Sequence, residues 1–286
     1  MSAEKLSVPD SGAHGARLAQ FFDGVQLPTL PEVAHTLVST LNDEDIPFEK
    51  VRQAISRDPS LTAKLIRLAN SARFGLPRQV VSLDDAITMV GLNQVRTLAM
   101  AACMAGSFSA VKGVDGKAFW EASSATAGYA QWLARTLGAD VQQSWLAGFM
   151  VRLGELIIAQ KLPDRISEFE RLPHLAGVRW ERENSALGFT EAHVASELAS
   201  RWKFPESIVA ALKSAADPLA TEPFNRLGAI VHLAALLAEL ELDEHKTPED
   251  AIAALPAELV RTLQLDPAWL REHMPDVRTF IDGGIA

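Results

Sequence analysis

The sequence contains few of the residues and patterns on which several common classes of protein depend. One cysteine among 286 residues excludes an intramolecular disulfide and a zinc site built from several cysteines, and it fits a reducing compartment. One tyrosine and an almost complete lack of alternating apolar and polar residues give no indication of β-strands. No run reaches the roughly 18 apolar residues of a membrane span, and the N-terminus lacks the apolar core of a signal peptide. We therefore expect a cytoplasmic protein without a membrane segment.

Motifs of common catalytic sites are missing as well. None of the seven histidines is followed by aspartate, and neither HExxH nor HxxxH occurs. The phosphate-binding loops GxxxxGK[ST] and GxGxxG and the nucleophile motif GxSxG do not occur either. Cys103 lies in an apolar helical stretch and is expected in the core. The residues alone show no enzyme signature and indicate no cofactor.

What the sequence does contain is helical periodicity. Leu30, Val33, Leu37, Val38 and Leu41 form one helical stripe, and similar stripes recur along the chain. Helix starts are predicted at Thr29 with Glu32, Asp58 with Pro59, Ser82 with Asp85, and at Asn93, Asp140 and Thr190. Long helices are predicted over 116–137, from Asp140 to Pro163, over 224–241 and over 249–272. The fold class is all-α.

The net charge of −9 is unevenly distributed. Residues 221–286 hold 5 basic and 12 acidic groups, so most of the excess belongs to the end of the chain. Residues 50–83 hold seven basic groups and one acidic group. This basic stretch is either a set of solvated helix faces or a surface for an anionic partner.

The turn within RLANSARFGLPRQ is the most distinctive local feature. Asn70 and Ser71 are poor helix formers at a helix end, and Gly75 is expected to adopt a positive φ. Pro77 fixes the exit of the chain from the turn. The turn either holds two helices together or serves as a docking surface for a partner.

Three stretches resemble a known family. They read LPTLPEVAHTLVSTLND from Leu27, ISRDPSLTAKLIRLANSARFGLP from Ile55 and VSLDDAITMVGLNQVRTLA from Val81. In residues and spacing they closely resemble the HDOD domain, the HD-related output domain of bacterial signalling proteins. Weaker similarity continues through FWEASSATAGYAQWLA, LAGFMVRLGELIIAQKLP and LGFTEAHVASELASRWKFPESIVAAL, so the resemblance covers roughly residues 20–216.

This resemblance implies a multi-helix HD-like bundle with an N-terminal helical subdomain. We divide the chain into a flexible lead-in (1–20), the HDOD domain (20–216) and an acidic helical extension packed on the domain (217–286). Within the domain, the N-terminal subdomain spans about 20–110 and the HD-like subdomain about 111–216.

HDOD domains resemble HD phosphohydrolases, whose metal site includes an adjacent His-Asp pair. Here Val151 and Arg152 stand where that pair is expected, and a guanidinium group repels a divalent cation. The other positions of this vestigial pocket are Ser123, Ser124, His193 and Lys213. Arg152 either forms an ion pair with Glu155 one turn later, near the bundle surface, or fills the vacated pocket in place of the metal.

These observations predict a regulatory module of signal transduction that is not an enzyme and acts by protein–protein contact. Its partners are signalling proteins, and an acidic one would suit the basic stretch; residues 239–250 of the same chain are a further candidate. The alternatives are binding of a nucleotide, nucleic acid or other anionic ligand through residues 50–83, and a residual metal-dependent phosphohydrolase. The candidate partner or anion-binding residues are Arg67, Asn70, Ser71, Arg73, Phe74, Arg78 and Arg96.

Overall fold

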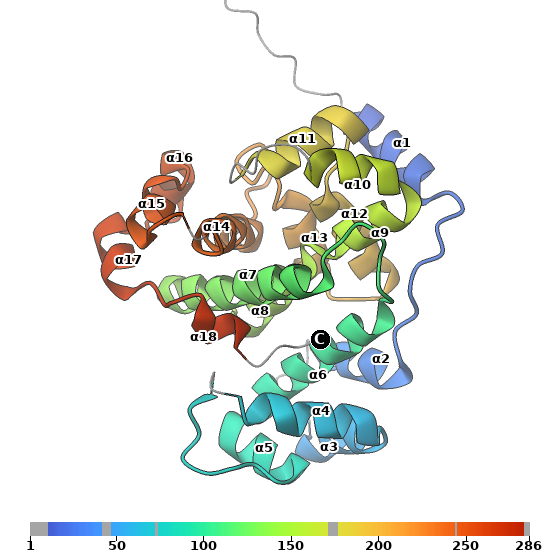
Figure 1. Ribbon diagram of the computed structural model, residues 1–286, viewed down its shortest axis with the longest axis vertical. Helices are drawn as coiled ribbons and strands as arrows, with labels where there is room; N and C mark the ends of the chain where they lie inside the picture. Colours follow the sequence, from blue (N-terminus) through green and yellow to red (C-terminus); the bar gives the residue numbers. More distant parts are fainter. Residues whose placement is uncertain (1–10, 42–46, 72–73, 171–176, 244, 283–286) are drawn as a thin grey trace, which may run out of the picture.

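The protein is helical throughout the part of the chain that the structure describes (Figure 1). This computed structural model describes residues 11–41, 47–71, 74–170, 177–243 and 245–282. None of the described helices is long and apolar enough to cross a membrane. The helices are α1 (Ser11–Phe22), α2 (Glu32–Val38), α3 (Phe48–Ser56), α4 (Pro59–Ala69), α5 (Leu83–Val90), α6 (Leu92–Ser107), α7 (Gly116–Leu137), α8 (Val141–Met150), α9 (Leu153–Lys161), α10 (Pro163–Glu170), α11 (Val178–Leu187), α12 (Glu191–Arg201), α13 (Glu206–Ser214), α14 (Arg226–Glu241), α15 (Pro248–Ala253), α16 (Ala257–Thr262), α17 (Pro267–His273) and α18 (Arg278–Ile281).

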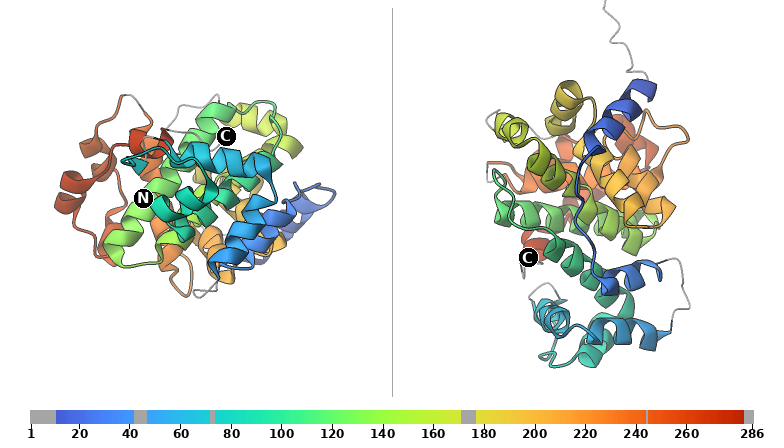
Figure 2. Two further views of the ribbon diagram at one scale, coloured as in Figure 1. Left: turned by 90° about the horizontal axis from the view of Figure 1, so that it is seen from below. Right: turned by 90° about the vertical axis from the view of Figure 1, so that its right-hand side faces the viewer.

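The helices form a small group and a larger bundle. Helices α2 to α6 lie together at the lower end of the molecule in Figure 1, and α7 to α14 form the bundle above them. Of the last helices, α15 packs beside α14 and α18 packs along α7. Helix α1 precedes the small group in sequence but lies on the bundle, and the chain between α1 and α2 runs along the outside (Figure 2).

Several helix starts confirm the sequence pattern. Asp58 accepts a hydrogen bond from the amide of Leu61, and Ser82 accepts one from Asp85. Asp140 caps α8, and Thr190 caps α12. In each case a short polar side chain satisfies amides that the first turn leaves unpaired.

Other predicted boundaries were wrong. Thr29 does not cap α2, because this helix begins at Glu32, after Pro31, and its N-cap makes no side-chain bond. Asn93 lies inside α6, whose N-cap is Gly91 with φ 97°. The expected helix from Asp140 to Pro163 is interrupted after Met150, so α8 and α9 are separate.

The expected helix over 249–272 is also interrupted. It consists of α15, α16 and α17, which begin next to Pro248, Pro256 and Pro267. Proline lacks an amide hydrogen and is tolerated only in the first turn of a helix, so each one starts a new helix. By contrast, the prediction for 116–137 is confirmed in full by α7, which ends at Gly138 with φ 62°.

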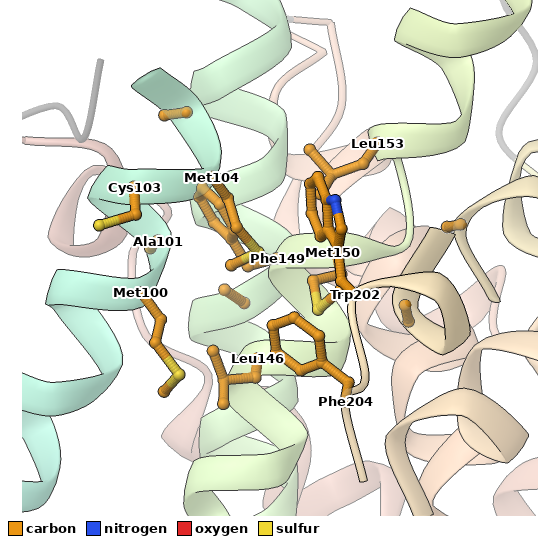
Figure 3. Packing of buried hydrophobic residues seen from close by; sticks show 14 of the residues in the cluster. Met100, Ala101, Cys103, Met104, Leu146, Phe149, Met150, Leu153, Trp202 and Phe204 are labelled. Carbon is orange, nitrogen blue, oxygen red and sulfur yellow. The ribbon is translucent and has the colours of Figure 1, made fainter. Parts of the chain in front are cut away.

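The small group and the bundle share one hydrophobic core. Met100 and Met104 of α6 lie in one apolar cluster with Phe149 and Met150 of α8, and Cys103 points away from α8 on the other side of α6 (Figure 3). The thiol of Cys103 is buried, and burial raises its pKa to about 12, so it packs as a core residue. Because packing is continuous between α6 and α8, it fixes the position of the small group relative to the bundle.

A second core joins α7 and α14 to the end of the chain. Tyr129 of α7 is fully buried, and its hydroxyl donates to the carbonyl of Pro275 over 3.1 Å. Gly128 must lack a side chain, because a Cβ atom there would lie 2.2 Å from the ring of Phe280. The predicted acidic extension is therefore bound to the bundle by a specific apolar interface.

The end of α1 is anchored firmly to the bundle. Phe21 and Phe22 are buried, and the ammonium group of Lys161 donates to the carbonyls of Phe21 and Asp23. A little further on, the indole of Trp202 donates to the carbonyl of Pro28 over 2.9 Å. Within the expected lead-in, residues 11–20 are helical, and of residues 15–20 only Leu18 is half-buried while the others are exposed.

Candidate functional site

The break between α8 and α9 places Arg152 at the meeting point of several helices. Gly154, two residues later, lets α9 approach the start of α12 closely, since a Cβ atom there would lie 2.0 Å from the carbonyl oxygen of Glu191. The turn at Val151 and Arg152 and the missing side chain at Gly154 together allow Glu191 to lie close to Arg152.

A buried group of five charged residues, here called the ion cluster, surrounds this point. Arg152 Nη2 lies 2.9 Å from Glu155 Oε2, and Arg179 Nη2 lies 3.2 Å from Glu155 Oε1. Arg179 Nε lies 3.3 Å from Glu183 Oε1 and 3.4 Å from Glu191 Oε2. The arginine side chains are 19% and 14% exposed, and the three glutamates at most 5%. The cluster joins α9, α11 and α12.

Further hydrogen bonds hold the carboxylates in place. Glu183 Oε2 accepts the backbone amide of Glu191 over 2.7 Å, and the indole of Trp180 donates to Glu191 Oε1 over 3.0 Å. At the start of α11, the amide of Gly177 donates to Glu239 Oε2. Helix α11 is therefore attached to the bundle largely by charged and polar groups.

The cluster contains three carboxylates and only two guanidinium groups. Burial raises the pKa of Glu183 to about 8, and the neighbouring Glu191 adds to this effect. Burial also raises the pKa of Glu191. Burial alone would raise the pKa of Glu155 too, but Arg179 and Arg152 lower it below its ordinary value. Glu183 and Glu191 together therefore retain a proton to higher pH than ordinary carboxyl groups do, whereas Glu155 is ionised at neutral pH.

Two cavities adjoin the cluster. A small one of about 30 Å³ is lined by Thr126, Arg152, Arg179 and Glu191, among others. An open cleft of about 620 Å³ is lined by Arg152, Glu155 and Arg179, together with Asp115 and Asp243. Within the described ranges, no group of three or more His, Cys, Asp or Glu side chains could hold a metal ion. The guanidinium groups would repel a divalent cation that approached from either cavity.

The ion-pair interpretation of Arg152 gave the correct partner but the wrong location. Arg152 does pair with Glu155, as the spacing predicted, but the pair is buried rather than near the surface. Arg179, Glu183 and Glu191 were not predicted to join this pair. The only local signal was the spacing of Arg179 and Glu183, which places both on one face of a helix.

The remaining residues of the expected pocket do not all converge on Arg152. Val151 is fully buried, Ser124 is buried, and the buried hydroxyl of Ser123 donates to the carbonyl of Phe119. His193 accepts the amide of Thr190 through Nδ1, so it completes the cap of α12. His193 and Lys213 line a different and larger cleft of about 1020 Å³.

The predicted partner-binding residues divide into exposed and structural ones. Arg67 is exposed, and Arg78, 55% exposed, pairs with Asp85 over 2.9 Å. Ser71 and Phe74 are half-buried, and Arg73 lies outside the described residues. Arg96 is only 5% exposed and donates to the carbonyl of Thr40 over 2.7 Å, so it does not belong to this surface.

Asn70 has a structural function in this region. Its side-chain amide donates to the carbonyl of Val80, and its side-chain oxygen accepts the amide of Val80, both over 2.8 Å. Gly75 has φ 51°, as predicted. Asn70 therefore ties the backbone of Val80 to the end of α4.

The basic stretch is less positive in the structure than in the sequence. Arg52 pairs with Glu49 over 2.7 Å, and Arg78 with Asp85, so acidic residues just outside the stretch neutralise two of its charges. Lys64 and Arg67 remain close together: burial and then the charge of Arg67 lower the pKa of Lys64. Residues 239–243 lie by α11 and the ion cluster, where Glu239 is bound to Gly177.

Comparison with known proteins agrees with this geometry. The sequence model of the HDOD domain matches residues 27–218. One similar solved structure comes from Shewanella amazonensis SB2B, and its name describes it as a phosphohydrolase by assignment only. It is 28% identical with a TM-score of 0.76, over 93% of this chain and 97% of that one. An HDOD domain protein of unknown function from Geobacter sulfurreducens is 25% identical with a TM-score of 0.73, over 94% of this chain and 89% of that one.

A curated relative extends beyond the length of this chain. An uncharacterized protein of Treponema pallidum (strain Nichols) is 25% identical over 188 residues, which make up 64% of this chain and 36% of that protein. The chain thus spans about a third of the length of that relative. The matches confirm the all-α HD-like fold that the sequence predicted.

Proposed function

Because the chain belongs to the HDOD domain family, we propose that it is a regulatory module that works by contact with other proteins and does not hydrolyse phosphate esters at its HD-like site. The observation that supports this most is the ion cluster. Arg152 stands where the resemblance to HD enzymes implies a metal ligand, and Arg179 reaches the same carboxylates from α11.

The cluster leaves little for a metal ion to bind. Both oxygens of Glu155 lie within 3.2 Å of a guanidinium nitrogen, and both oxygens of Glu183 have partners in the cluster. A divalent cation would have to displace Arg152 or Arg179 and leave a buried guanidinium without its carboxylate. Breaking a buried ion pair in this way costs about 3–5 kcal/mol.

The test is metal content together with hydrolysis. The protein is purified without chelator, incubated with Mn²⁺, Fe²⁺ and Zn²⁺, desalted, and assayed for bound metal and for turnover of bis(p-nitrophenyl) phosphate. We expect far less than one equivalent of metal and no turnover above the buffer. Two results together would refute the proposal. One is about one equivalent of bound metal, and the other is turnover that Arg152→Ala changes but that the surface control Arg165→Ala leaves unchanged.

The surface that we propose for partner contact is the exposed edge of the small helical group. Val81 is 72% exposed, and the exposed Arg67 and Arg78 precede the two residues, Asn70 and Val80, that are joined by hydrogen bonds. The two hydrogen bonds between Asn70 and Val80 reduce the conformational freedom that the neighbouring residues would lose when a partner binds, which favours recognition. Guanidinium groups form paired, charge-assisted hydrogen bonds with carboxylates, so we propose an acidic signalling protein as partner.

A second candidate function is the binding of a nucleotide or nucleic acid at Lys64 and Arg67. Their proximity is the observation that favours it, because two adjacent cations concentrate positive potential. Binding of this kind would weaken steeply with salt, by a slope that reports the number of phosphate contacts. Titration of a labelled oligonucleotide at increasing NaCl concentration measures that slope. A flat dependence would leave the acidic protein as the preferred partner.

A further inference from the structure

The end of the chain carries a groove that lies outside the residues matched by the HDOD sequence model. Helices α15, α16 and α17 surround a groove of about 550 Å³. Each of the three helices is short because proline starts a new one, so together they curve around the groove instead of forming one straight rod. In Figure 1 these helices lie at the left edge of the molecule, away from the ion cluster and from α2 to α6.

The floor of the groove is apolar. Ile252, Leu255, Val260 and Leu265 line it and keep only 6–8% of their surface exposed. These side chains belong to the second core, which continues beneath them to α14 and α7. The groove is therefore an opening in a packed core, and its apolar floor can take up apolar side chains from outside.

The rim carries two arginines, although the end of the chain is acidic. Residues 221–286 hold 5 basic and 12 acidic groups, yet the groove is lined by Arg261 and Arg271 and by a single acidic residue, Glu249. Arg261 has only a loose contact with Glu258, 3.9 Å apart, with both side chains more than two thirds exposed. Such an exposed pair is weak and can be exchanged for another carboxylate.

We propose that the groove binds an acidic amphipathic helix of a partner protein, with the apolar face of that helix on Ile252, Leu255, Val260 and Leu265 and its carboxylates at Arg261 and Arg271. Apolar side chains at helical spacing match a groove of this kind, and opposite charge at the rim fixes the orientation of the helix. The inference rests on the proposed function, because it gives that function a second contact surface with a stated partner chemistry.

The test uses two designed peptides and three forms of the full chain. One labelled helical peptide of about 15 residues carries leucines on one face and glutamates on the other, and the second has lysine in place of each glutamate. Fluorescence anisotropy gives their affinities for the wild type, for Arg261→Glu with Arg271→Glu, and for the control Lys246→Glu with Arg278→Glu. Both double variants change the net charge equally, and all four residues are exposed.

We expect the acidic peptide to bind the wild type and the control alike and to lose tenfold or more in affinity for the groove variant. We expect the lysine peptide to bind the wild type more weakly than the acidic one. Equal losses in both variants would mean general charge attraction, and binding unchanged by the groove variant would place the site elsewhere. Either result would overturn the inference.

Binding of neither peptide to the wild type would overturn it too. Hydrogen exchange of the complex adds an independent readout, since protection should appear in α15 to α17. The metal and hydrolysis assay does not depend on these residues. Failure of the groove and failure of the proposed function are therefore distinguishable.

Discussion

The charge balance of the ion cluster predicts an unusual dependence of stability on pH. Glu183 is fully buried, and its folded pKa of about 8 lies well above its ordinary value of 4.5. Between these values the folded chain holds a proton that the unfolded chain releases. The contribution of Glu183 to the free energy of unfolding is thus fully present below about pH 4.5 and is lost progressively as the pH rises towards 8.

The size of the effect follows from the pKa difference. At about 1.4 kcal/mol per pKa unit, the gap between 4.5 and about 8 corresponds to a decrease in the free energy of unfolding on the order of 5 kcal/mol between these pH values. That is a large part of the total stability of a typical domain, about 5–15 kcal/mol. Glu155 has a lowered pKa and acts in the opposite direction, but only in more acidic solution.

The perturbation is Glu183→Gln, which resembles the protonated side chain and cannot ionise. Urea unfolding followed by tryptophan fluorescence at pH 5, 6, 7 and 8 gives the free energy of unfolding of both proteins. We expect similar stability at pH 5, a clear fall in the wild type towards pH 8, and a much shallower fall in the variant. The matched control is Glu168→Gln on the surface, whose side chain is 59% exposed and which should follow the wild type. If the curves of the wild type and of Glu183→Gln are parallel, Glu183 is not the proton carrier.

Three further predictions concern other residues. Arg179→Met should lower the free energy of unfolding at pH 7 by about 3–5 kcal/mol, because it leaves three buried carboxylates facing one guanidinium; no loss in urea unfolding would contradict this. Gly75→Ala should lower it by about 1 kcal/mol through backbone strain alone, since a Cβ atom there meets nothing within 4 Å, and an unchanged melting temperature would exclude a left-handed turn. Arg67→Glu with Arg78→Glu should leave the fold intact and weaken a partner recovered from the native cell about tenfold or more at low salt; unchanged affinity would move the contact away from the small helical group.

The accuracy of the sequence predictions depended on how local the determining interaction was. The bounds of α7 were predictable, because Gly138 ends the helix within its own turn. Pro256 and Pro267 gave an equally local signal for three short helices, and the apolar periodicity across them concealed it. The break at Val151 could not be read from the sequence, because the residues on both sides form one apolar run.

The ion cluster shows the opposite limit. Arg152 and Glu155 were predictable as a pair, but Arg179 and Glu191 meet them only after α11 and α12 have packed against α9. Arg96 is a second example. Nothing in the neighbouring sequence indicates that its guanidinium group is buried against Thr40. Long-range packing decides such positions, and residue spacing along the chain does not reveal it.

The position of α1 on the bundle makes the small helical group an insertion. The bundle begins with α1 and resumes at α7, and the chain leaves and re-enters it on either side of α2–α6. Both crossings pass Trp202, which binds the carbonyl of Pro28 and lies 6.3 Å, ring to ring, from Phe108. A partner that binds α4 or α5 is therefore connected to the bundle by two routes, the core that α6 shares with α8 and the contacts of Trp202 with both connecting segments.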